Sequence, residues 1–298
     1  MTTVLPAALL AARLERLPTV VYVGEIFPIR DTDGTARALG GRVIACLSAA
    51  LADRLVCCSK TVAGQFKRHG RTVTIYPGIS RDHAEGDRAG FRARYGLEAA
   101  SPVIAVVGNL TAGRGQDTAV RALALIRERL PGAQLVIAGL PPRPIDEAFA
   151  ASVHDLASEL GVERSVVFTG FVERVADVYA AADVVNPARF NEPFGRVALE
   201  ALTAGRPVVA SAVGAIPEVL RDGRDALLVP SDDPVALAEA VSRFVEDPAL
   251  RDRLVAEGSR RVRSEFGEEA GVEAFERVIA DVLEQRSGGP RSRSSSPG

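Results

Sequence analysis

From Ser101 onward, short apolar runs rich in β-branched residues alternate with amphipathic helical stretches. The runs are nearly continuously apolar, which is the pattern of strands covered on both faces. Alternation of such strands with helices predicts a parallel, doubly wound α/β sheet. The predicted strands are Val103–Val107, Leu135–Ala138, Val166–Thr169, Asp183–Asn186, Val208–Ala210 and Ala226–Val229. The clearest helical stretches between them are Asp117–Leu130, Ile145–Leu160 and Val197–Ala204.

Glycines and loop-forming residues follow these strands. The strand ends with such residues are Gly108-Asn109, Gly139-Leu140, Gly170-Phe171, the Pro187–Gly195 loop and Ser211–Gly214. In a doubly wound sheet, ligands bind outside the carboxyl ends of the strands, where glycine lets a ligand approach the backbone and helix N-termini favour an anion. A turn alone explains any single one of these glycines. Their convergence on one edge of the sheet predicts a binding cleft.

The first part of the chain also alternates, but its strands and helices are too few for a complete domain. Its predicted helices are Leu5–Leu17, Thr35–Ala52 and Lys60–His69, and its predicted strands are Thr19–Val23, Leu55–Cys57 and Val73–Tyr76. So few strands close only part of a sheet and leave one flank without partners. The predicted boundaries are 1–94 for a partial N-terminal domain with its linker (Ser80–Arg94), 95–270 for a C-terminal domain, 271–286 for a C-terminal helix, and 287–298 for a disordered tail.

Charge and composition narrow the class of protein. The formal net charge of −2 argues against a dedicated nucleic-acid binder. Up to Glu98, 14 basic and 9 acidic residues leave the chain mildly positive, which suits an anionic acceptor or a membrane surface, although a solvated face is the commoner explanation. Cys46, Cys57 and Cys58 fit neither a disulfide framework nor a zinc site. We therefore expect a cytoplasmic protein, either free or peripheral to the inner face of the membrane.

The densest group of polar and glycine residues is Asn191–Ala201, where a loop leads into a predicted helix. Glu192 precedes this helix, and Glu200 is predicted about two turns inside it, near the same edge of the cleft. A carboxylate at Glu200 can accept two hydrogen bonds from a ribose diol, each worth on the order of 1.5–3 kcal/mol. The alternative is that both glutamates are solvated and only complement the helix dipole.

A second group, Gly108–Asp117, leads from the first strand of the C-terminal domain into its helix. Gly113 and Gly115 flank Arg114, an arrangement that suits a backbone folded around a phosphate with a guanidinium beside it. The segment is not a Walker loop, and it contains no Gly-x-Gly-x-x-Gly. By itself, this group is a weak indication of phosphate binding.

Taken in order, these motifs resemble the GT-B glycosyltransferases of family 4, over about Thr2 to Phe266. The motifs are Gly-x-Leu-x3-Arg-Gly, Gly170-Phe171-Val172, Glu192-x-Phe-Gly-x4-Glu200 and the Gly205–Glu218 segment. The resemblance implies a GT-B-like α/β fold, with a complete Rossmann-like C-terminal donor domain and a partial Rossmann-like N-terminal domain. Members of this family retain the anomeric configuration, use no metal site and need no cofactor beyond the nucleotide-sugar substrate.

The resemblance also implies a role for each matching residue. Arg114 stands where the family has a lysine on the donor phosphates, and Asn109 where it usually has an arginine with the same task. Glu192 matches the glutamate that meets the sugar hydroxyls, and Glu200 matches the one that holds the ribose. Arg114 and Glu192 are therefore the expected catalytic residues. The expected donor-binding residues are Asn109, Gly113, Phe171 and Val172 beside the base, Phe194 and Gly195 through their backbone N–H groups, Arg196, and Glu200.

Two departures from the family pattern leave alternatives open. Asn109 carries no charge, and Gly24 stands where the family has an active-site histidine or arginine in the Val20–Pro28 segment. The family's opening strands and glycine-rich loop have no counterpart here, so we expect the chain to begin inside a domain. Three alternatives are open: a fragment, a misplaced start, or one half of a split enzyme whose N-terminal domain a partner chain completes.

The first hypothesis is a retaining glycosyltransferase that uses a nucleotide-sugar donor and an acceptor of unknown identity. The second is a non-catalytic nucleotide-sugar binding fragment or a subunit of a split enzyme. A nucleotide-sugar epimerase is disfavoured by the two glutamates eight residues apart. It is also disfavoured because His69, His83 and His154 are predicted at the surface.

Overall fold

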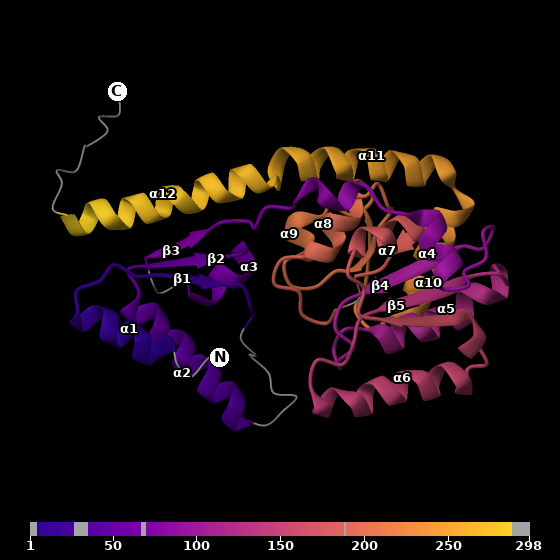
Figure 1. Cartoon of the computed structure of the whole chain (residues 1–298), viewed down its shortest axis with the longest axis horizontal. Helices are drawn as coiled ribbons and strands as arrows, with labels where there is room; N and C mark the ends of the chain where they lie inside the picture. Colours follow the sequence, from indigo (N-terminus) through magenta and orange to yellow (C-terminus); the bar gives the residue numbers. More distant parts are fainter. Residues whose placement is uncertain (1–4, 27–34, 67–69, 188, 288–298) are drawn as a thin grey trace. The chain divides into compact units, whose positions relative to one another are not determined.

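The computed structural model describes residues 5–26, 35–66, 70–187 and 189–287, which belong to two compact units (Figure 1). We call residues 1–78 with 269–298 unit 1, and residues 79–268 unit 2. Three parts of the sequence predictions lie outside the described residues. They are residues 27–28 of the Val20–Pro28 segment, His69, and residues 288–298 of the predicted tail. No helix in the described part of the chain has the length and apolar character needed to cross a bilayer.

Unit 2 contains the predicted parallel sheet. Its strands are β4 (Val103–Val107), β5 (Gln134–Ala138), β6 (Val166–Gly170), β7 (Val184–Val185), β8 (Val209–Ser211) and β9 (Leu227–Val229). β6, β5, β4 and β7 pair in that order, and β8 pairs with β9. A parallel bridge from Val185 to Val208 joins the two sets. The resulting order, β6-β5-β4-β7-β8-β9, is that of a doubly wound dinucleotide-binding sheet and confirms the predicted fold class.

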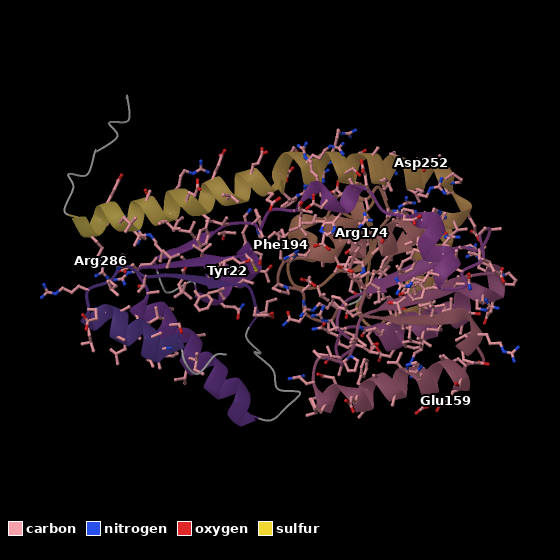
Figure 2. All side chains as sticks on the ribbon, in the orientation of Figure 1. Tyr22, Glu159, Arg174, Phe194, Asp252 and Arg286 are labelled. Atoms are coloured by element: carbon pink, nitrogen blue, oxygen red, sulfur yellow. The ribbon has the colours of Figure 1, made fainter. Side chains whose placement is uncertain are left out.

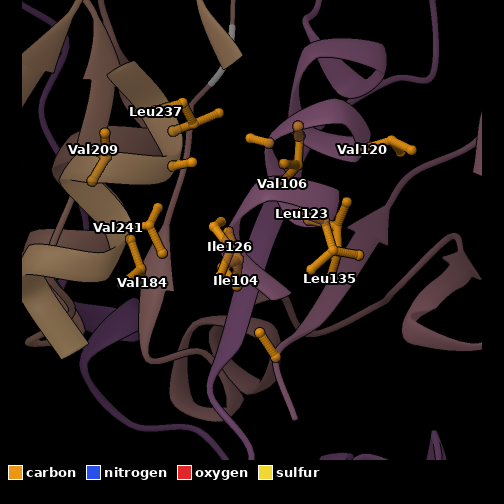
Figure 3. Packing of buried hydrophobic residues seen from close by; sticks show 14 of the residues in the cluster. Ile104, Val106, Val120, Leu123, Ile126, Leu135, Val184, Val209, Leu237 and Val241 are labelled. Atoms are coloured by element: carbon orange, nitrogen blue, oxygen red, sulfur yellow. The ribbon is translucent and has the colours of Figure 1, made fainter. Parts of the chain in front are cut away.

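Helices cover both faces of this sheet. They are α4 (Arg88–Arg94), α5 (Gln116–Arg129), α6 (Glu147–Glu159), α7 (Val175–Ala181), α8 (Arg196–Thr203), α9 (Ile216–Val219), α10 (Pro234–Glu246) and α11 (Pro248–Glu265), with short 3-10 turns η2 (Arg81–Ala84), η3 (Pro144–Asp146) and η4 (Glu163–Ser165). Ile104, Leu123 and Val241 belong to the core formed by the sheet with α5, α6 and α10 (Figure 3). These side chains are apolar because both faces of the strands are excluded from water.

The chain reverses its direction of travel across the sheet between β4 and β7. From β4 it proceeds to α5, which packs on α10, whereas from β7 it proceeds to α8, which packs on α11. Two adjacent strands whose following helices diverge leave a crevice at their carboxyl ends. Glycine is required beside this crevice: a Cβ on Gly139, at the end of β5, would lie 2.0 Å from the Gly108 carbonyl oxygen.

The segment predicted as a plain connection, Ser80–Arg94, contains η2 and α4. Arg92 of α4 is 5% exposed and donates to the Ala181 carbonyl oxygen and to Asp183 Oδ2. Arg88 donates to Asp183 Oδ1 at 2.7 Å. Arg88 and Arg92 thus anchor α4 to the segment that enters β7, because their guanidinium groups are satisfied by carbonyl and carboxylate oxygens.

Unit 1 contains a smaller parallel sheet. Its strands β1 (Val20–Val23), β2 (Arg54–Cys57) and β3 (Thr72–Thr74) pair in chain order, with helices α1 (Leu5–Leu14), α2 (Thr35–Leu51), α3 (Lys60–Ala63), the 3-10 turn η1 (Gly64–Phe66) and the C-terminal helix α12 (Glu268–Ser287). α12 packs on this sheet through Val278, which clusters with Val56 and Ile75. Arg286, labelled in Figure 2, donates to both carboxylate oxygens of Asp53 at 2.8 Å.

Candidate functional site

Arg114, the residue predicted to bind the donor phosphates, lies over the end of β4. A Cβ built on Gly108 would stand 3.1 Å from Arg114 Nη1, so the guanidinium lies close against the strand end. Gly108 has a φ of +136°, which other residues rarely adopt. Gly115 is the N-cap of the 14-residue helix α5, also with a positive φ of 69°. A guanidinium and the positive end of a helix dipole therefore lie close together, as anion binding requires.

The two groups predicted from sequence lie side by side. The Phe190 N–H, in the loop after β7, donates to the Gly113 carbonyl oxygen at 3.0 Å, and a Cβ on Gly113 would lie 3.5 Å from the Phe190 ring. Gln116 Nε2 donates to the Asn109 carbonyl oxygen at 2.9 Å and ties the loop after β4 to α5. The side chain of Asn109 is exposed at the same edge. Contact between these loops places both sets of candidate residues at the switch between β4 and β7.

Glu192 folds back onto the N-terminus of α8. The backbone N–H groups of Phe194 and Gly195 donate to Glu192 Oε1 at 3.2 and 2.9 Å, and Arg189 Nη1 lies 3.4 Å from Oε2. These are the two N–H groups predicted to meet phosphate or sugar. In the structure they hold the carboxylate of Glu192, which is a negatively charged cap at the positive end of the helix.

The turn after β8 holds this loop in place. The Ala215 N–H donates to the Glu192 carbonyl oxygen at 2.8 Å. A Cβ on Gly214, whose φ is +55°, would lie 2.1 Å from that same carbonyl oxygen. Phe194, labelled in Figure 2, is 3% exposed and makes an edge contact with the Phe266 ring. The backbone around Glu192 is therefore fixed from two sides.

Glu200 lies on α8 but is little more than one turn inside the helix, not two, because the helix begins at Arg196. It is 7% exposed. Oε2 accepts a hydrogen bond from the Tyr179 hydroxyl at 2.8 Å, and Oε1 accepts from Arg196 Nη2 at 3.1 Å. His83 Nε2 lies 3.6 Å from Oε1. Glu200 is therefore not a solvated residue at the start of a helix. Because its carboxylate is buried, it needs the hydrogen bonds from Tyr179 and Arg196.

Sequence reasoning missed two of these partners. His83, predicted at the surface, is half-buried, and its ring packs edge-on against that of Tyr179 with 6.0 Å between centroids. The surface position predicted for His154 is correct, and its ring stacks on Phe168. Tyr179 sits in an apolar helical run like any core residue, so the local pattern carried no sign of its hydroxyl bond.

The residues predicted to bind the base, Phe171 and Val172, directly follow β6. Phe171 is 77% exposed, Val172 is half-buried, and Leu140 at the end of β5 is 52% exposed. Exposed apolar groups at a sheet edge can stack on a flat ligand. Within the described residues, no group of three or more His, Cys, Asp or Glu side chains is arranged to hold a metal ion.

A carboxylate outside the site joins two of the loops at this edge. Asp146 in η3 accepts from the Thr111 hydroxyl at 2.6 Å and from Arg143 Nε at 2.8 Å. These two hydrogen bonds, the Arg143 bond most strongly, lower the pKa of Asp146 to about 2. The loop after β4 is therefore tied to the loop after β5 by an ionised carboxylate.

The sequence matches a family model described as glycosyl transferases group 1 over residues 87–261. A curated D-inositol 3-phosphate glycosyltransferase of Mycobacteroides abscessus is 38% identical over 203 residues, 65% of this chain and 44% of that protein. The chain spans about half the length of the curated relatives it matches.

Solved structures share its fold. The structure of Anabaena HepE with UDP-glucose has a TM-score of 0.86 at 22% identity, covering 94% of this chain and 77% of that one. The C-terminal domain of a group 1 family protein (LpcC) from Francisella tularensis has a TM-score of 0.58 at 22% identity, covering 64% and 99%. These likenesses confirm the expected GT-B-like α/β fold.

Proposed function

This chain belongs to the glycosyl transferases group 1 family, and from that membership we propose that it acts in transferring a sugar from a nucleoside diphosphate-sugar donor to an acceptor. The observation that carries the proposal is the convergence of three groups at the switch between β4 and β7. These are the Arg114 guanidinium over Gly108, the N-terminus of α8, and the Glu200 carboxylate one turn inside that helix. They suit the diphosphate and the ribose of one donor.

The chemistry of the leaving group explains why these residue types are needed. As the glycosidic bond breaks, negative charge develops on the diphosphate oxygens, and fixed donors must stabilise it. In this proposal, Arg114 and the N-termini of α5 and α8 do so without a metal ion. Loss of one preorganised donor costs roughly 2.7–4 kcal/mol of transition-state stabilisation in comparable sites.

Glu192 has two roles in this mechanism. In the structure its carboxylate caps the Phe194 and Gly195 N–H groups. A donor phosphate at those N–H groups displaces the carboxylate, which then turns to the hydroxyls of the transferred sugar. We propose that transfer retains the anomeric configuration, as the resemblance to family 4 implies.

The acceptor and the location follow from weaker observations. The matched curated relatives are named for D-inositol 3-phosphate, so a phosphorylated polyol is the acceptor to test first. The basic excess up to Glu98 suits such an anion. We place the protein in the cytoplasm or at the inner face of the membrane, in keeping with its three free cysteines.

A second function has its own supporting observation. Asn109, with an uncharged side chain at the edge beside Arg114, leaves this pair with one cation. A site with less positive charge binds a diphosphate but stabilises its developing charge less well. This favours a nucleotide-sugar binding subunit, without turnover of its own, as the alternative.

Calorimetric titration of the full chain with UDP, GDP and ADP tests the donor site. We expect one of them to bind, and Glu200→Ala to weaken binding about tenfold or more, since a charge-assisted bond to the ribose is lost. Glu239→Ala, the same change at an exposed position of α10, is the matched control. Absence of binding to all three nucleotides would reject the donor site.

Donor turnover separates the enzyme from the binding subunit. We expect the full chain to release UDP, GDP or ADP from the matching glucose donor, with inositol 3-phosphate raising the rate. Arg114→Ala is expected to reduce the rate by about 100-fold or more, whereas Arg114→Lys keeps the charge and most of the rate. Binding without release in the wild-type chain would favour the subunit.

A further inference from the structure

The two oxygens of the Glu200 carboxylate have different surroundings. Oε2 faces Tyr179, which is 0% exposed, and accepts its hydroxyl at 2.8 Å. Oε1 faces Arg196, whose side chain is 68% exposed, and His83, whose side chain is 23% exposed. One edge of the carboxylate is therefore turned into the protein, and the other toward its solvent-accessible side. An exposed arginine moves aside at low cost, because its contacts with the carboxylate are largely replaced by water.

Tyr179 is a fixed donor. Burial, and next the negative charge of Glu200, raise the pKa of Tyr179 well above its ordinary value of 10.0, so the hydroxyl keeps its proton. It can therefore donate to Glu200 throughout the physiological pH range. The alternative, a buried Oε2 without a donor, is unfavourable because a desolvated carboxylate oxygen needs a hydrogen bond.

The backbone around Tyr179 allows it little movement. The segment that carries His83 lies directly against α7, since a Cβ on Gly86 would stand 2.2 Å from the Ala176 carbonyl oxygen. The Asp87 N–H donates to Asp177 Oδ1 at 2.8 Å, which attaches the same segment to the start of α7. The His83 ring then packs edge-on against the Tyr179 ring. These contacts come from residues far apart in the chain, so the ring position is set by the fold.

We propose that Tyr179 is a positioning residue for nucleotide recognition: its hydroxyl sets the plane of the Glu200 carboxylate so that this carboxylate distinguishes ribose from 2′-deoxyribose. The inference rests on the proposed donor site and deepens it. Oε1, on the solvent-accessible side, can accept from the hydroxyls of a ribose diol only if the carboxylate plane is held toward them. Without the tyrosine hydroxyl, the carboxylate rotates to recover a partner for Oε2, and the 2′-hydroxyl loses its acceptor.

The experiment compares ribose with deoxyribose nucleotides in the full chain. Calorimetric titrations are run with the pairs UDP and dUDP, GDP and dGDP, and ADP and dADP, and the ratio of the two Kd values is taken for the pair that binds. We expect a ratio of about tenfold or more in the wild-type chain, the size of one charge-assisted hydrogen bond. Tyr179→Phe is expected to reduce the ratio to below about threefold, mainly by weakening binding of the ribose nucleotide.

Tyr95→Phe is the matched control, because it makes the same change in unit 2. Tyr95 is the C-cap of α4 and packs on the Phe91 ring of that helix, with 4.6 Å between the ring centroids. This variant is expected to keep the wild-type ratio. A general loss of stability would weaken both nucleotides of a pair alike, so the ratio reports the carboxylate geometry itself.

The outcomes separate this inference from the proposed function. A wild-type ratio that persists in Tyr179→Phe overturns the role of Tyr179 while the donor site stands. A wild-type chain that binds none of the six nucleotides overturns both. If Tyr179→Phe does not fold, Tyr179→Met replaces it, since this flexible apolar side chain also removes the hydroxyl and leaves the Glu200 carboxylate intact. An unchanged ratio in that variant overturns the inference, and a reduced ratio supports it.

Discussion

Glycines at the sheet edge occupy positions where a methyl group has no room. Gly108 lies under the Arg114 guanidinium, and Gly214 lies against the Glu192 backbone. Glycine is favoured at both positions for a local reason, because each has a positive φ, and for a long-range reason, because another segment of the chain lies close by. At the residue scale, the shape of the candidate site therefore depends on its glycines as well as on its charged side chains.

Gly214→Ala is expected to destabilise unit 2 and to weaken nucleotide-sugar binding. The new Cβ would meet the Glu192 carbonyl oxygen at 2.1 Å, so the loop before α8 must move. Gly223→Ala is a matched control, because Gly223 has a similar φ of +67° but no atom near its Cβ position. The left-handed backbone is expected to lower the free energy of unfolding by about 1 kcal/mol in each variant, and the clash to lower it by about 2 kcal/mol more in Gly214→Ala. Chemical unfolding measures both values. Equal losses of stability in the two variants would show that the Cβ at position 214 meets no clash.

The pH dependence of stability is expected to show the Asp146 interaction. Its pKa is lowered to about 2 in the folded chain from 3.8, so its contribution is present above about pH 4 and is lost as the pH falls toward 2. The difference in unfolding midpoint between the wild-type chain and Asp146→Asn should therefore narrow between pH 4 and pH 2. Urea unfolding at a series of pH values measures it. A difference that stays constant through this range would show that the carboxylate charge is unimportant.

At the scale of elements, the helices do more than cover the sheets. α8 carries Glu200 and presents its N-terminus to Glu192, so one short helix supplies two of the three groups of the proposed donor site. α12 belongs to unit 1, although it follows unit 2 in the sequence, because Val278 packs with Val56 and Ile75. Position along the chain and position in the fold are therefore separate properties of an element.

Val278→Asp is expected to unfold the sheet of unit 1 by placing a carboxylate among apolar side chains, at a cost of about 3 kcal/mol. The neighbouring Ile279 is 40% exposed on α12, so Ile279→Asp is the matched control and should change stability by less than about 0.5 kcal/mol. Hydrogen exchange in peptides that contain β1 to β3 is the measurement. Equal exchange in the two variants would show that α12 is not part of this core.

At the scale of the whole molecule, two units have separate cores. The contacts described above for the proposed donor site lie within unit 2. That unit also contains the complete sheet and its covering helices. A unit of this size with its own core and sheet is expected to fold independently.

A fragment of residues 79–268 is therefore expected to unfold cooperatively and to bind the same nucleoside diphosphate as the full chain, with a Kd within about threefold. Circular dichroism during heating and calorimetric titration measure the two properties. Donor turnover is expected to be lost, because unit 1 is absent. A folded fragment without nucleotide binding would show that unit 1 contributes to the donor site.

Sequence alone was enough to predict the alternation of strands and helices and the parallel sheet, because the strands are apolar runs, and glycine stands at the ends of β4, β5 and β6. It also placed Arg114 and Glu192 at the loops after β4 and β7, since motif spacing and strand ends are local properties of the chain. The length of α8 before Glu200 was wrong by about one turn. Helix ends depend on capping contacts that apolar periodicity does not contain.

Only the tertiary structure decided which partners hold Glu200. Tyr179 reads as a core residue, and His83 as a surface residue, until the fold brings α7, α8 and η2 together. It also decided that the charged segment before residue 95 contains a helix with a buried arginine, because Arg92 donates to oxygens of Ala181 and Asp183, about 90 residues further along the chain. A pattern of residues sets what each segment can form alone. Burial and hydrogen bonding between distant segments exist only once the chain has folded.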